Sequence, residues 1–509
     1  MKYLVSKEEM ESYDNNTTAY FQIPSLVLME RAALFVYEYI RKNYSISSKI
    51  LLVCGMGNNG ADAMALARML YLGKYSVTVL IVGNKENFSV SALKQYEILQ
   101  KYDIPLEDVL PEKEYDIIVD GLFGIGLSRD ITGDYEQLIS GLNNQNAIKI
   151  ALDIPSGVDA SNGTIKNCAI IADITITFGY IKKGMMLYPG KTLCGKIITA
   201  DIGINEHSFM GQYPVAFTYD NLDLSLLPKR SSYGNKGDFG KALIIAGSYQ
   251  MAGACEIAAK ACYRMGAGMV KVVTSTKNRL IIQTNLPEAL LSCYDTDRDF
   301  SDFADILEED LKWCNCVCMG PGLGKDRYAK QLISFLFERT PPQIPFIIDA
   351  DAINIISESD NLRGKLRENN TREIIMTPHI GELSRFTGLP VEMLKTDLEK
   401  ILKQTVENYP IVLVAKDAVT MVYDKKNKLY INCSGNEGMA TAGMGDALSG
   451  IITALIAQGA DSYLAASLGV YIHGLCGDLA KEEMGSYSLM ASDVIKQLKN
   501  LFKGGFLND

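Results

Sequence analysis

Hydrophobic residues follow two alternating patterns along the 509 residues of the chain. Runs of about four to eight apolar residues, typical of buried parallel strands, alternate with stretches in which apolar residues return every three or four positions, as on one face of a helix. A first long helix is expected at about 24–43, and KILLVCGMGNNGADAMALARML (49–70) predicts a strand, a glycine turn and a helix. Repeated along the chain, this cycle predicts an α/β protein with doubly wound, mostly parallel sheets.

The strand and helix cycle is interrupted once. Between about residues 205 and 228 no long element is expected, and the cycle restarts with KGDFGKALIIAGS (236–248). The chain is also too long for one ordinary hydrophobic core. We therefore predict two domains, at 1–214 and 225–509.

The amino-acid composition excludes some classes of binding partner. The net charge of −10 argues against a nucleic-acid groove, because phosphate backbones are bound through Lys and Arg. No leader and no run of about eighteen apolar residues is found, so a cytoplasmic protein without a membrane partner is expected. The eleven scattered cysteines fit a reducing compartment, and Cys314, Cys316 and Cys318 are interpreted as small core residues rather than zinc ligands.

Polar side chains follow three predicted strands of the first domain. Asn58 and Asn59 follow the first, Asp120 ends the second, and Asp153 and Ser156 follow the third. Because parallel strands end at one edge of a sheet, these groups are expected to converge on one crevice. Amide, hydroxyl and carboxylate oxygens suit a weakly held cation, which leaves Asp153 for proton transfer. Each residue taken alone has an alternative role as a helix cap or turn residue.

In the second domain, a glycine-punctuated loop runs into an apolar helix within 435–459, and Asp446 lies at the helix start. Backbone amides and the helix dipole suit a phosphate there, with Asp446 as a base beside it; the alternative is a tight turn. Lys416 follows another strand and is interpreted as a phosphate contact or a solvated side chain. His379 lies at a strand edge as a ligand or turn residue, whereas His473 is expected in the core.

The first three glycine- and aspartate-rich segments, GMGNNGADA, VDGLFGIGLSRDITG and ALDIPSGVDASNG, resemble the signatures of the NAD(P)H-hydrate epimerase domain, which is Rossmann-like. The similarity spans about residues 1–214. It implies contacts with the hydrated cofactor from Asn58, Asn59, Gly60, Ala61, Asp62, Gly124, Ile125, Gly126, Leu127, Ser128, Arg129, Asp130 and Asp153. It further implies a potassium ion held by Asn59, Asp120 and Ser156, and a catalytic acid or base at Asp153.

One departure from the epimerase pattern concerns the first loop. The family usually has glycine where this chain has Ala61 and Ala63. A β-carbon costs little at negative φ and about 1 kcal/mol or more at positive φ. Either the loop tolerates alanine or epimerase activity is reduced.

Six later segments, KGDFGKALIIAGS, GPGLG, DADAIN, TPHIGE, AKDAVT and GNEGMATAGMGD, resemble in their order the ADP-dependent NAD(P)H-hydrate dehydratase domain, which has a ribokinase-like fold. The similarity covers about 225–501. It implies that ADP or ATP is bound by Lys416, Asp417, Ala418, Val419, Thr420 and Gly445. It implies that the hydrated nucleotide is faced by Ala254, Gly324, His379 and Asp446. Asp417, Ala442 and Met444 depart from the usual pattern and are expected to affect nucleotide preference.

Together the two resemblances predict a bifunctional repair enzyme, an isomerase and a lyase. The first domain would interconvert the R and S hydrates of NADH and NADPH (NADHX and NADPHX) at C6. The second would dehydrate the S form with ADP or ATP and magnesium, with Asp446 as general base. A homo-oligomer is expected. The alternative is a ribokinase-like small-molecule kinase with a non-catalytic N-terminal nucleotide-binding module.

Overall fold

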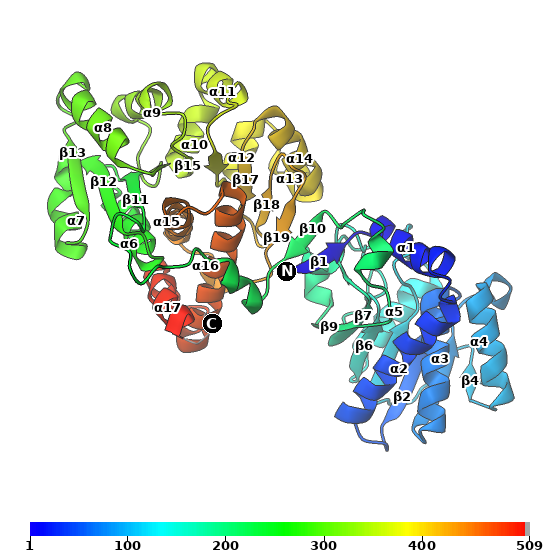
Figure 1. The fold of residues 1–509 in the computed structure, drawn as a ribbon. Coiled ribbons are helices and arrows are strands. Elements are labelled where there is room, and N and C mark those ends of the chain that lie inside the picture. Colours follow the sequence, from blue (N-terminus) through cyan, green and yellow to red (C-terminus); the bar gives the residue numbers. More distant parts are fainter. Residues whose placement is uncertain (504–509) are drawn as a thin grey trace. The chain divides into compact units, whose positions relative to one another are not determined.

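The computed structural model describes residues 1–503 and shows two compact units (Figure 1). One unit is Tyr3–Ala216, and the other combines Met1–Lys2 with the chain from Phe217 onward. The end of the domain expected at 225–509, residues 504–509, lies outside the described residues. Each unit is an α/β structure built around its own sheet.

The first unit has a seven-stranded parallel sheet in the order β4-β3-β2-β5-β6-β7-β9. These strands are β2 (Lys49–Cys54), β3 (Ser76–Ile81), β4 (Leu106–Glu107), β5 (Ile117–Gly121), β6 (Ile148–Leu152), β7 (Ile174–Phe178) and β9 (Lys196–Ala200). A further parallel pair joins β1 (Lys2–Val5) to β8 (Ile181–Lys182). The strand order reverses between β2 and β5, which is where open α/β sheets bind ligands.

Helices cover both faces of this sheet. They are α1 (Lys7–Asn15), α2 (Ser25–Asn43), α3 (Asn58–Leu72), α4 (Val90–Lys101) and α5 (Asp134–Asn144). Alternate residues of β2 point to opposite faces: Ile50 and Leu52 join the core under α2 and α3, whereas Leu51 and Val53 join the core under α5. Burial on both faces explains the continuous apolar runs of the sequence.

The strands of the second unit lie side by side in the order β13-β12-β11-β14-β15-β16-β17-β18-β19-β10. The strands are β10 (Ala216–Thr218), β11 (Lys241–Ile245), β12 (Met269–Ser275), β13 (Leu290–Tyr294), β14 (Cys316–Met319), β15 (Phe346–Ile348), β16 (Ile374–Met376), β17 (Val412–Ala415), β18 (Met421–Tyr423) and β19 (Leu429–Ile431). The seven strands from β13 to β17 in that order are parallel, and β17, β18 and β19 are antiparallel neighbours. The order reverses between β11 and β14.

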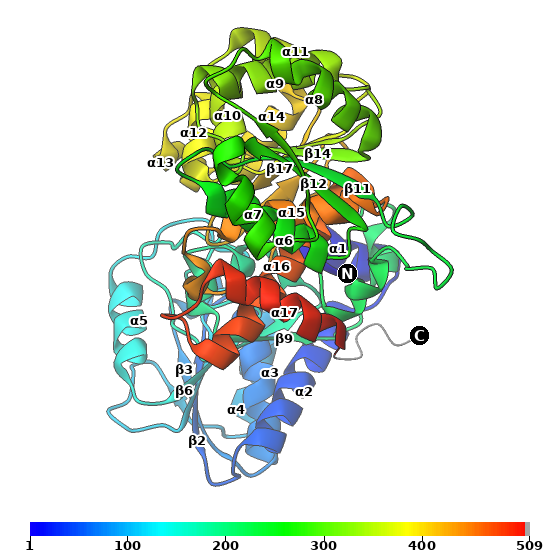
Figure 2. The same ribbon diagram turned by 90° about the vertical axis from the view of Figure 1, so that its left-hand side faces the viewer.

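The helices of the second unit form a layer on each side of its sheet. They are α6 (Ala252–Arg264), α7 (Arg279–Asn285), α8 (Ser301–Trp313), α9 (Arg327–Arg339), α10 (Ala350–Ser357), α11 (Asp360–Arg367), α12 (Ile380–Thr387), α13 (Val391–Thr396), α14 (Leu398–Asn408), α15 (Met444–Ala457), α16 (Ser462–Met484) and α17 (Ala491–Lys503). In Figure 1 and Figure 2, α8 and α9 lie on one side of the sheet and α6, α15 and α17 on the other. The latter three share a core with alternate strand residues, among them Ile244 and Cys318.

The predictions for the first long helix and for the interruption between the domains are confirmed. The helix expected at 24–43 is α2, and the interruption at 205–228 contains only β10 and the short 3-10 helices η5 (Glu206–Phe209) and η6 (Asn221–Leu226). Cys314, Cys316 and Cys318 are buried. Within residues 1–503, no helix combines the length and apolar character needed to cross a membrane.

Candidate active sites

The first candidate site is a cavity of about 790 Å³ beyond the carboxyl ends of β2, β5 and β6. Its lining contains ten of the residues expected to contact the hydrated cofactor: Asn58, Asn59, Asp62, Gly124, Ile125, Gly126, Leu127, Ser128, Arg129 and Asp153. Three others do not line it. Gly60 and Ala61 are buried in α3, and Asp130 is exposed. Strand ends far apart in sequence are thus brought to one crevice, as the motif positions predict.

The three residues expected to hold a cation are joined in one cluster beside this cavity. Ser156 Oγ donates to Asp120 Oδ1 at 2.6 Å and also contacts the carbonyl oxygen of Phe123 at 3.1 Å. Asn59 Nδ2 donates to the same carbonyl at 3.0 Å, while its buried Oδ1 has no hydrogen-bond partner among the described residues. Burial raises the pKa of Asp120, and hydrogen bonds from Ser156 oppose that shift. An unpaired amide oxygen beside a carboxylate, a hydroxyl and a carbonyl fits a cation with oxygen ligands.

Asp153 is held in the cavity by an unusual backbone and by a buried lysine. Its φ is +64°, a left-handed conformation that aspartate tolerates better than most residues and that clusters at functional sites. Oδ1 of Asp153 accepts hydrogen bonds from the ammonium of Lys182 and, at 2.9 Å, from the backbone N–H of Phe178. The side chain of Lys182 is 0% exposed, so an ion pair is buried in the wall of this cavity.

Two further carboxyl groups face Asp153. Burial, and then the charges of Asp153 and Asp14, raise the pKa of Asp62 well above its ordinary value, and Lys182 only partly opposes them. Burial and the charge of Asp153 likewise raise the pKa of Asp14 in α1. Both side chains line the cavity. One lysine therefore compensates a cluster of three carboxyl groups.

Helix α3 accommodates Ala61 and Ala63, the two positions where the epimerase pattern usually has glycine. Both residues lie inside helix α3, both are fully buried, and neither has a positive φ. A β-carbon at Gly60, in contrast, would lie 1.9 Å from the carbonyl oxygen of Gly55. The loop requires glycine at Gly60 and accepts alanine at the other two positions.

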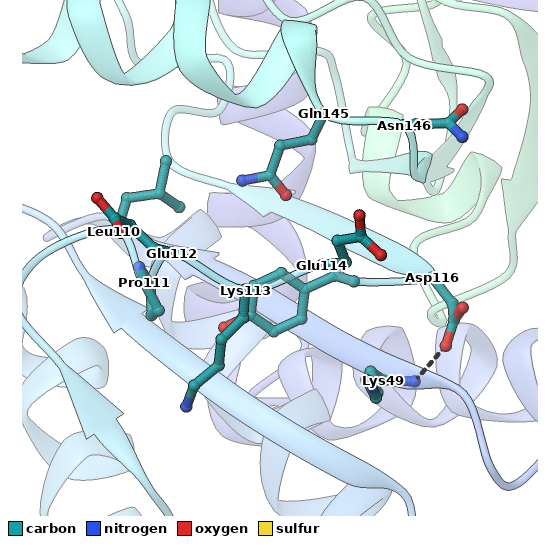
Figure 3. A pocket seen from close by; sticks show the side chains of 10 residues that line it. Lys49, Leu110, Pro111, Glu112, Lys113, Glu114, Asp116, Gln145 and Asn146 are labelled. Carbon is teal, nitrogen blue, oxygen red and sulfur yellow. Dashed lines mark hydrogen bonds between the residues drawn. The ribbon is translucent and has the colours of Figure 1, made fainter.

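A second cavity of the first unit lies at the opposite edge of the sheet (Figure 3). It has about 730 Å³ and lies where β2 and β5 begin. The backbone N–H of Lys49 donates to Asp116 Oδ2 at 2.7 Å there, the bond drawn in Figure 3. None of the residues predicted to act on a ligand lines this cavity.

The second candidate site is the start of helix α15. Its N-cap is Gly443, at φ +89°, which offers no side chain to the helix end. The backbone N–H groups of Met444, Gly445 and Asp446 donate to no residue within 1–503. Free amides at a helix start, together with the helix dipole, form an anion site.

The earlier part of the predicted phosphate loop has a different role. The N–H of Gly435 donates to Asp478 Oδ2 at 2.9 Å, and Asn436 Nδ2 donates to Asp478 Oδ1 at 2.9 Å. Lys481 pairs with Glu437 at 2.8 Å. Because α16 holds this part of the loop, the prediction that Gly435 offers its amide to a phosphate is wrong; the free amides lie at 444–446.

Lys416 is fixed beside the start of α15. Its ammonium donates to Asp349 Oδ1 at 2.8 Å, and Ser449 Oγ in α15 donates to Asp349 Oδ2 at 2.7 Å. A β-carbon at Gly445 would lie 3.2 Å from Lys416 Nζ, so the helix start and the ammonium are adjacent. A positive charge and free amides at one place suit a phosphoryl group.

Asp446 projects from the first turn of α15 among other acidic groups. Burial and the charge of Asp349 raise the pKa of Asp446 to about 7, with Lys416 opposing the shift and Asp351 and Glu382 adding to it. A carboxyl group near half-ionisation at neutral pH is matched to the work of a general base.

Gly324 and His379, two of the remaining predicted residues, contact the acidic groups Asp351 and Glu382, whose charges act on Asp446. Gly324 N–H donates to Asp351 Oδ2 at 2.8 Å, and the neighbouring Gly322 loop packs on Ala254, whose β-carbon would lie 2.7 Å from one placed at Gly322. His379 is the N-cap of α12: its Nδ1 accepts from the N–H of Gly381 at 2.9 Å, while its side chain is 55% exposed.

The segment predicted to contact the adenine nucleotide joins β17 to β18. Asp417 and Ala418 are exposed in it, Val419 is buried and Thr420 is half-buried. His473 is buried as expected, and burial followed by the charge of Lys416 lowers its pKa to about 4.

Comparison with known proteins identifies the family. A family model described as NAD(P)H-hydrate dehydratase matches residues 242–500, and one described as YjeF-related protein N-terminus matches residues 25–184. The bifunctional NAD(P)H-hydrate repair enzyme of Coxiella burnetii is 34% identical over 483 residues, 93% of this chain and 94% of that protein. The chain belongs to the family of bifunctional NAD(P)H-hydrate repair enzymes.

The resemblance to this repair-enzyme family extends over both units. The Moorella thermoacetica enzyme of the same name is 33% identical over 518 residues, 97% of this chain and 95% of that protein. A crystal structure of a ribokinase-like superfamily protein from Enterococcus faecalis is 26% identical, covers 57% of this chain and 97% of its own, and superimposes with a TM-score of 0.51. The predicted fold class and family are confirmed.

Sequence reasoning missed several charged residues of these repair-enzyme sites. Asp349 and Asp351 occur in the quoted DADAIN segment, so their position after a strand was a usable signal. Lys182 and Asp14 had no such signal. They reach the cavity from β8 and α1, and only the tertiary fold brings them to Asp153.

Proposed function

We propose that this chain restores NADH and NADPH from their hydrates by two reactions. The first unit interconverts the R and S hydrates at C6, and the second removes water from the S hydrate at the expense of ADP or ATP. Family membership over both units supports the pair of activities. The arrangement of Asp446, Lys416 and the free amides at 444–446 supports the second activity most directly.

The C6 hydroxyl of the hydrate is a poor leaving group, and phosphorylation makes it a good one. Asp446 would take the hydroxyl proton while the oxygen attacks the terminal phosphorus of the nucleotide. Lys416 and the amides at 444–446 would stabilise the negative charge on the transferring group. The ring nitrogen lone pair would then expel phosphate, and loss of a proton from C5 restores the dihydropyridine. From ADP the products would be AMP, phosphate and the reduced cofactor.

Magnesium would accompany the nucleotide. Mg²⁺ in phosphoryl-transfer sites is held by substrate phosphates and one or two carboxylates. Residues 1–503 contain no group of three or more His, Cys, Asp or Glu side chains able to hold a metal. The carboxylates of Asp351 and Asp446, which interact electrostatically, would hold the ion, and the ion would neutralise charge on the nucleotide.

In the first unit, potassium would be held by Asn59, Asp120 and Ser156. The unpaired buried Oδ1 of Asn59 is the observation that supports this site. Such an ion would place a positive charge beside the bound hydrate. Asp153 would contact the C6 hydroxyl and move its proton.

Product analysis separates this proposal from a small-molecule kinase of the same fold. Incubation of the S hydrate with ADP, ATP and magnesium should yield the reduced cofactor and inorganic phosphate. A stable phosphorylated product instead would favour the kinase. Exchange between purified R and S hydrates without nucleotide tests the first unit, and Asp120→Asn should remove its response to K⁺ when KCl replaces LiCl.

The oligomeric state and the cellular location of the protein are the last two properties to be tested. We retain a homo-oligomer and a cytoplasmic location as predictions. Light scattering of the purified chain measures the first, and cell fractionation measures the second.

A further inference from the structure

We propose that Asp62 is a second catalytic carboxyl group of the first unit: it donates a proton to the departing C6 hydroxyl, while Asp153, paired with Lys182, accepts the proton of the water that returns. The inference rests on the proposed epimerase function. It assigns different protonation states and different tasks to two carboxyl groups of one cavity.

Both carboxyl groups line the 790 Å³ cavity from different elements. Asp62 extends from the second turn of α3, and Asp153 follows β6. The charge of Asp153 acts on Asp62 and raises its pKa. Inversion at C6 requires one group to assist departure of the oxygen and another to assist its return on the opposite face. The reaction therefore needs two groups that are held by different elements.

The hydrogen bonds of Lys182 decide which carboxyl group is paired. Its buried ammonium donates to Asp153 Oδ1, to Thr177 Oγ1 at 3.0 Å and to the carbonyl oxygen of Phe178 at 2.9 Å. These three acceptors use all three of its protons. Asp62 accepts no hydrogen bond from any residue of the described chain. The buried ammonium of Lys182 is therefore paired with Asp153 and not with Asp62.

The charges around Asp62 favour its neutral form. Burial raises its pKa, the like charges of Asp153 and Asp14 raise it further, and the charge of Lys182 opposes these shifts. The cavity lining also includes Glu11 and Arg129, one of each sign. A neutral Asp62 can act as the acid, and an ion-paired Asp153 can act as the base, because their different surroundings separate their pKa values.

The proposed epimerisation breaks the C6–O bond and forms it again on the other face of C6. A proton moves from Asp62 to the C6 hydroxyl oxygen, the C6–O bond breaks with its electron pair on oxygen, and water leaves. The lone pair of N1 forms a C6=N1 double bond, and the cation is stabilised by the carboxylates of the cavity. Water then adds to the other face of C6, and its proton passes to Asp153. Solvent returns the proton from Asp153 to Asp62.

Asp62→Asn tests the acid role because the amide copies the shape of a protonated carboxyl group without its transferable proton. With wild type and variant as full chains, kcat for exchange between purified R and S hydrates should fall by about 100-fold or more, with KM changed by less than about threefold. Incorporation of ¹⁸O from labelled water into the hydrate should fall in parallel. Glu97→Gln, which changes an exposed carboxylate of α4, is the matched control and should match wild type.

The pH dependence of hydrate exchange is a second readout, which would not change if Asp62 only contacted the substrate. Because the charge of Asp14 helps to raise the pKa of Asp62, Asp14→Asn should move the high-pH fall of exchange to lower pH. Carbon-13 NMR of labelled aspartate in the wild-type protein should show Asp62 protonated at pH 7, and this measurement does not depend on the folding of a variant.

Three results would overturn the inference: wild-type exchange by Asp62→Asn, a variant whose KM rises with kcat unchanged, or an ionised Asp62 at pH 7. If wild-type protein itself fails to exchange the hydrates, the epimerase proposal fails instead. The two failures are therefore distinguishable.

Discussion

Lys416 Nζ lies 2.8 Å from Asp349 Oδ1, and this ion pair fixes a positive charge beside the start of α15. Asp349 is 1% exposed, and its other oxygen accepts from Ser449, so the carboxylate joins the end of β15, the end of β17 and α15. A buried carboxylate with both oxygens engaged holds its partner in one position. The phosphate site thus depends on Asp349, which need not touch the nucleotide.

Replacing Asp349 with Asn should affect both nucleotide binding and the base. Lys416 loses its anchor, so KM for the nucleotide should rise about tenfold. The charge of Asp349 raises the pKa of Asp446, so its removal should shift the acid limb of dehydratase kcat/KM to lower pH. Asp305→Asn, at an exposed position of α8, is the control. An unmoved acid limb would contradict the coupling.

The pH dependence of dehydration should follow Asp446. A general base must be ionised, and burial raises the pKa of this group to about 7. Measured on the free enzyme, kcat/KM should therefore fall about tenfold per pH unit below pH 7. Asp446→Asn should lower kcat by about 100-fold to 10,000-fold. A profile flat down to pH 5 would remove Asp446 as the base.

The same carboxyl group should limit stability. Its pKa rises from 3.8 unfolded to about 7 folded, so the protonated form is favoured in the folded state, and stability is lost as pH rises from about 4 to 7. Asp446→Asn removes that loss. Its free energy of unfolding should exceed that of wild type by a few kcal/mol at pH 8, at about 1.4 kcal/mol per pKa unit, and by less at pH 5. Denaturant melts at both values measure this, and a constant difference would contradict it.

Gly445→Ala should weaken nucleotide binding without unfolding the chain. The new β-carbon would lie 3.2 Å from Lys416 Nζ and push the ammonium from its place. KM for the nucleotide should rise about threefold to tenfold, whereas alanine in a helix adds about 0.5–1 kcal/mol of stability. Gly364→Ala in α11, where a β-carbon meets nothing within 4 Å, is the matched control. Equal nucleotide KM values in the two variants would show that the contact has no effect.

Restoring glycine at Ala63 should not improve the epimerase. Ala63 is fully buried in α3, and its β-carbon lies 2.5 Å from one placed at Gly121, so the two positions are packed together. Ala63→Gly should lower the free energy of unfolding by about 1 kcal/mol and leave the hydrate exchange rate within about twofold. A severalfold faster exchange would show that alanine had impaired this loop.

Much of this architecture was predictable because the residues that bind ligands in α/β sheets lie at the carboxyl ends of the strands. Asn59, Asp120 and Ser156 lie at or just beyond the ends of three different strands, and the parallel order of those strands brings them together. The start of α15 was predictable for a related reason, since glycines before an apolar helix mark free amides.

The electrostatic partners of the sites were not predictable in the same way. Lys416 and Asp349 are 67 residues apart, and no local pattern pairs them. Lys182 and Lys183 are adjacent and equivalent in sequence, yet the fold aims Lys182 at Asp153. The raised pKa of Asp446 likewise follows from burial and from the carboxylates of Asp349, Asp351 and Glu382, which only the tertiary structure assembles.

Recovery of reduced cofactor from an equal mixture of R and S hydrates tests the central claim most directly. With ADP or ATP and magnesium, the near-ultraviolet absorbance of the dihydronicotinamide should return completely for wild type. It should stop near half for Asp153→Asn, which leaves the R hydrate unconverted, and should not return for Asp446→Asn. No recovery by wild-type protein with either nucleotide would contradict the account.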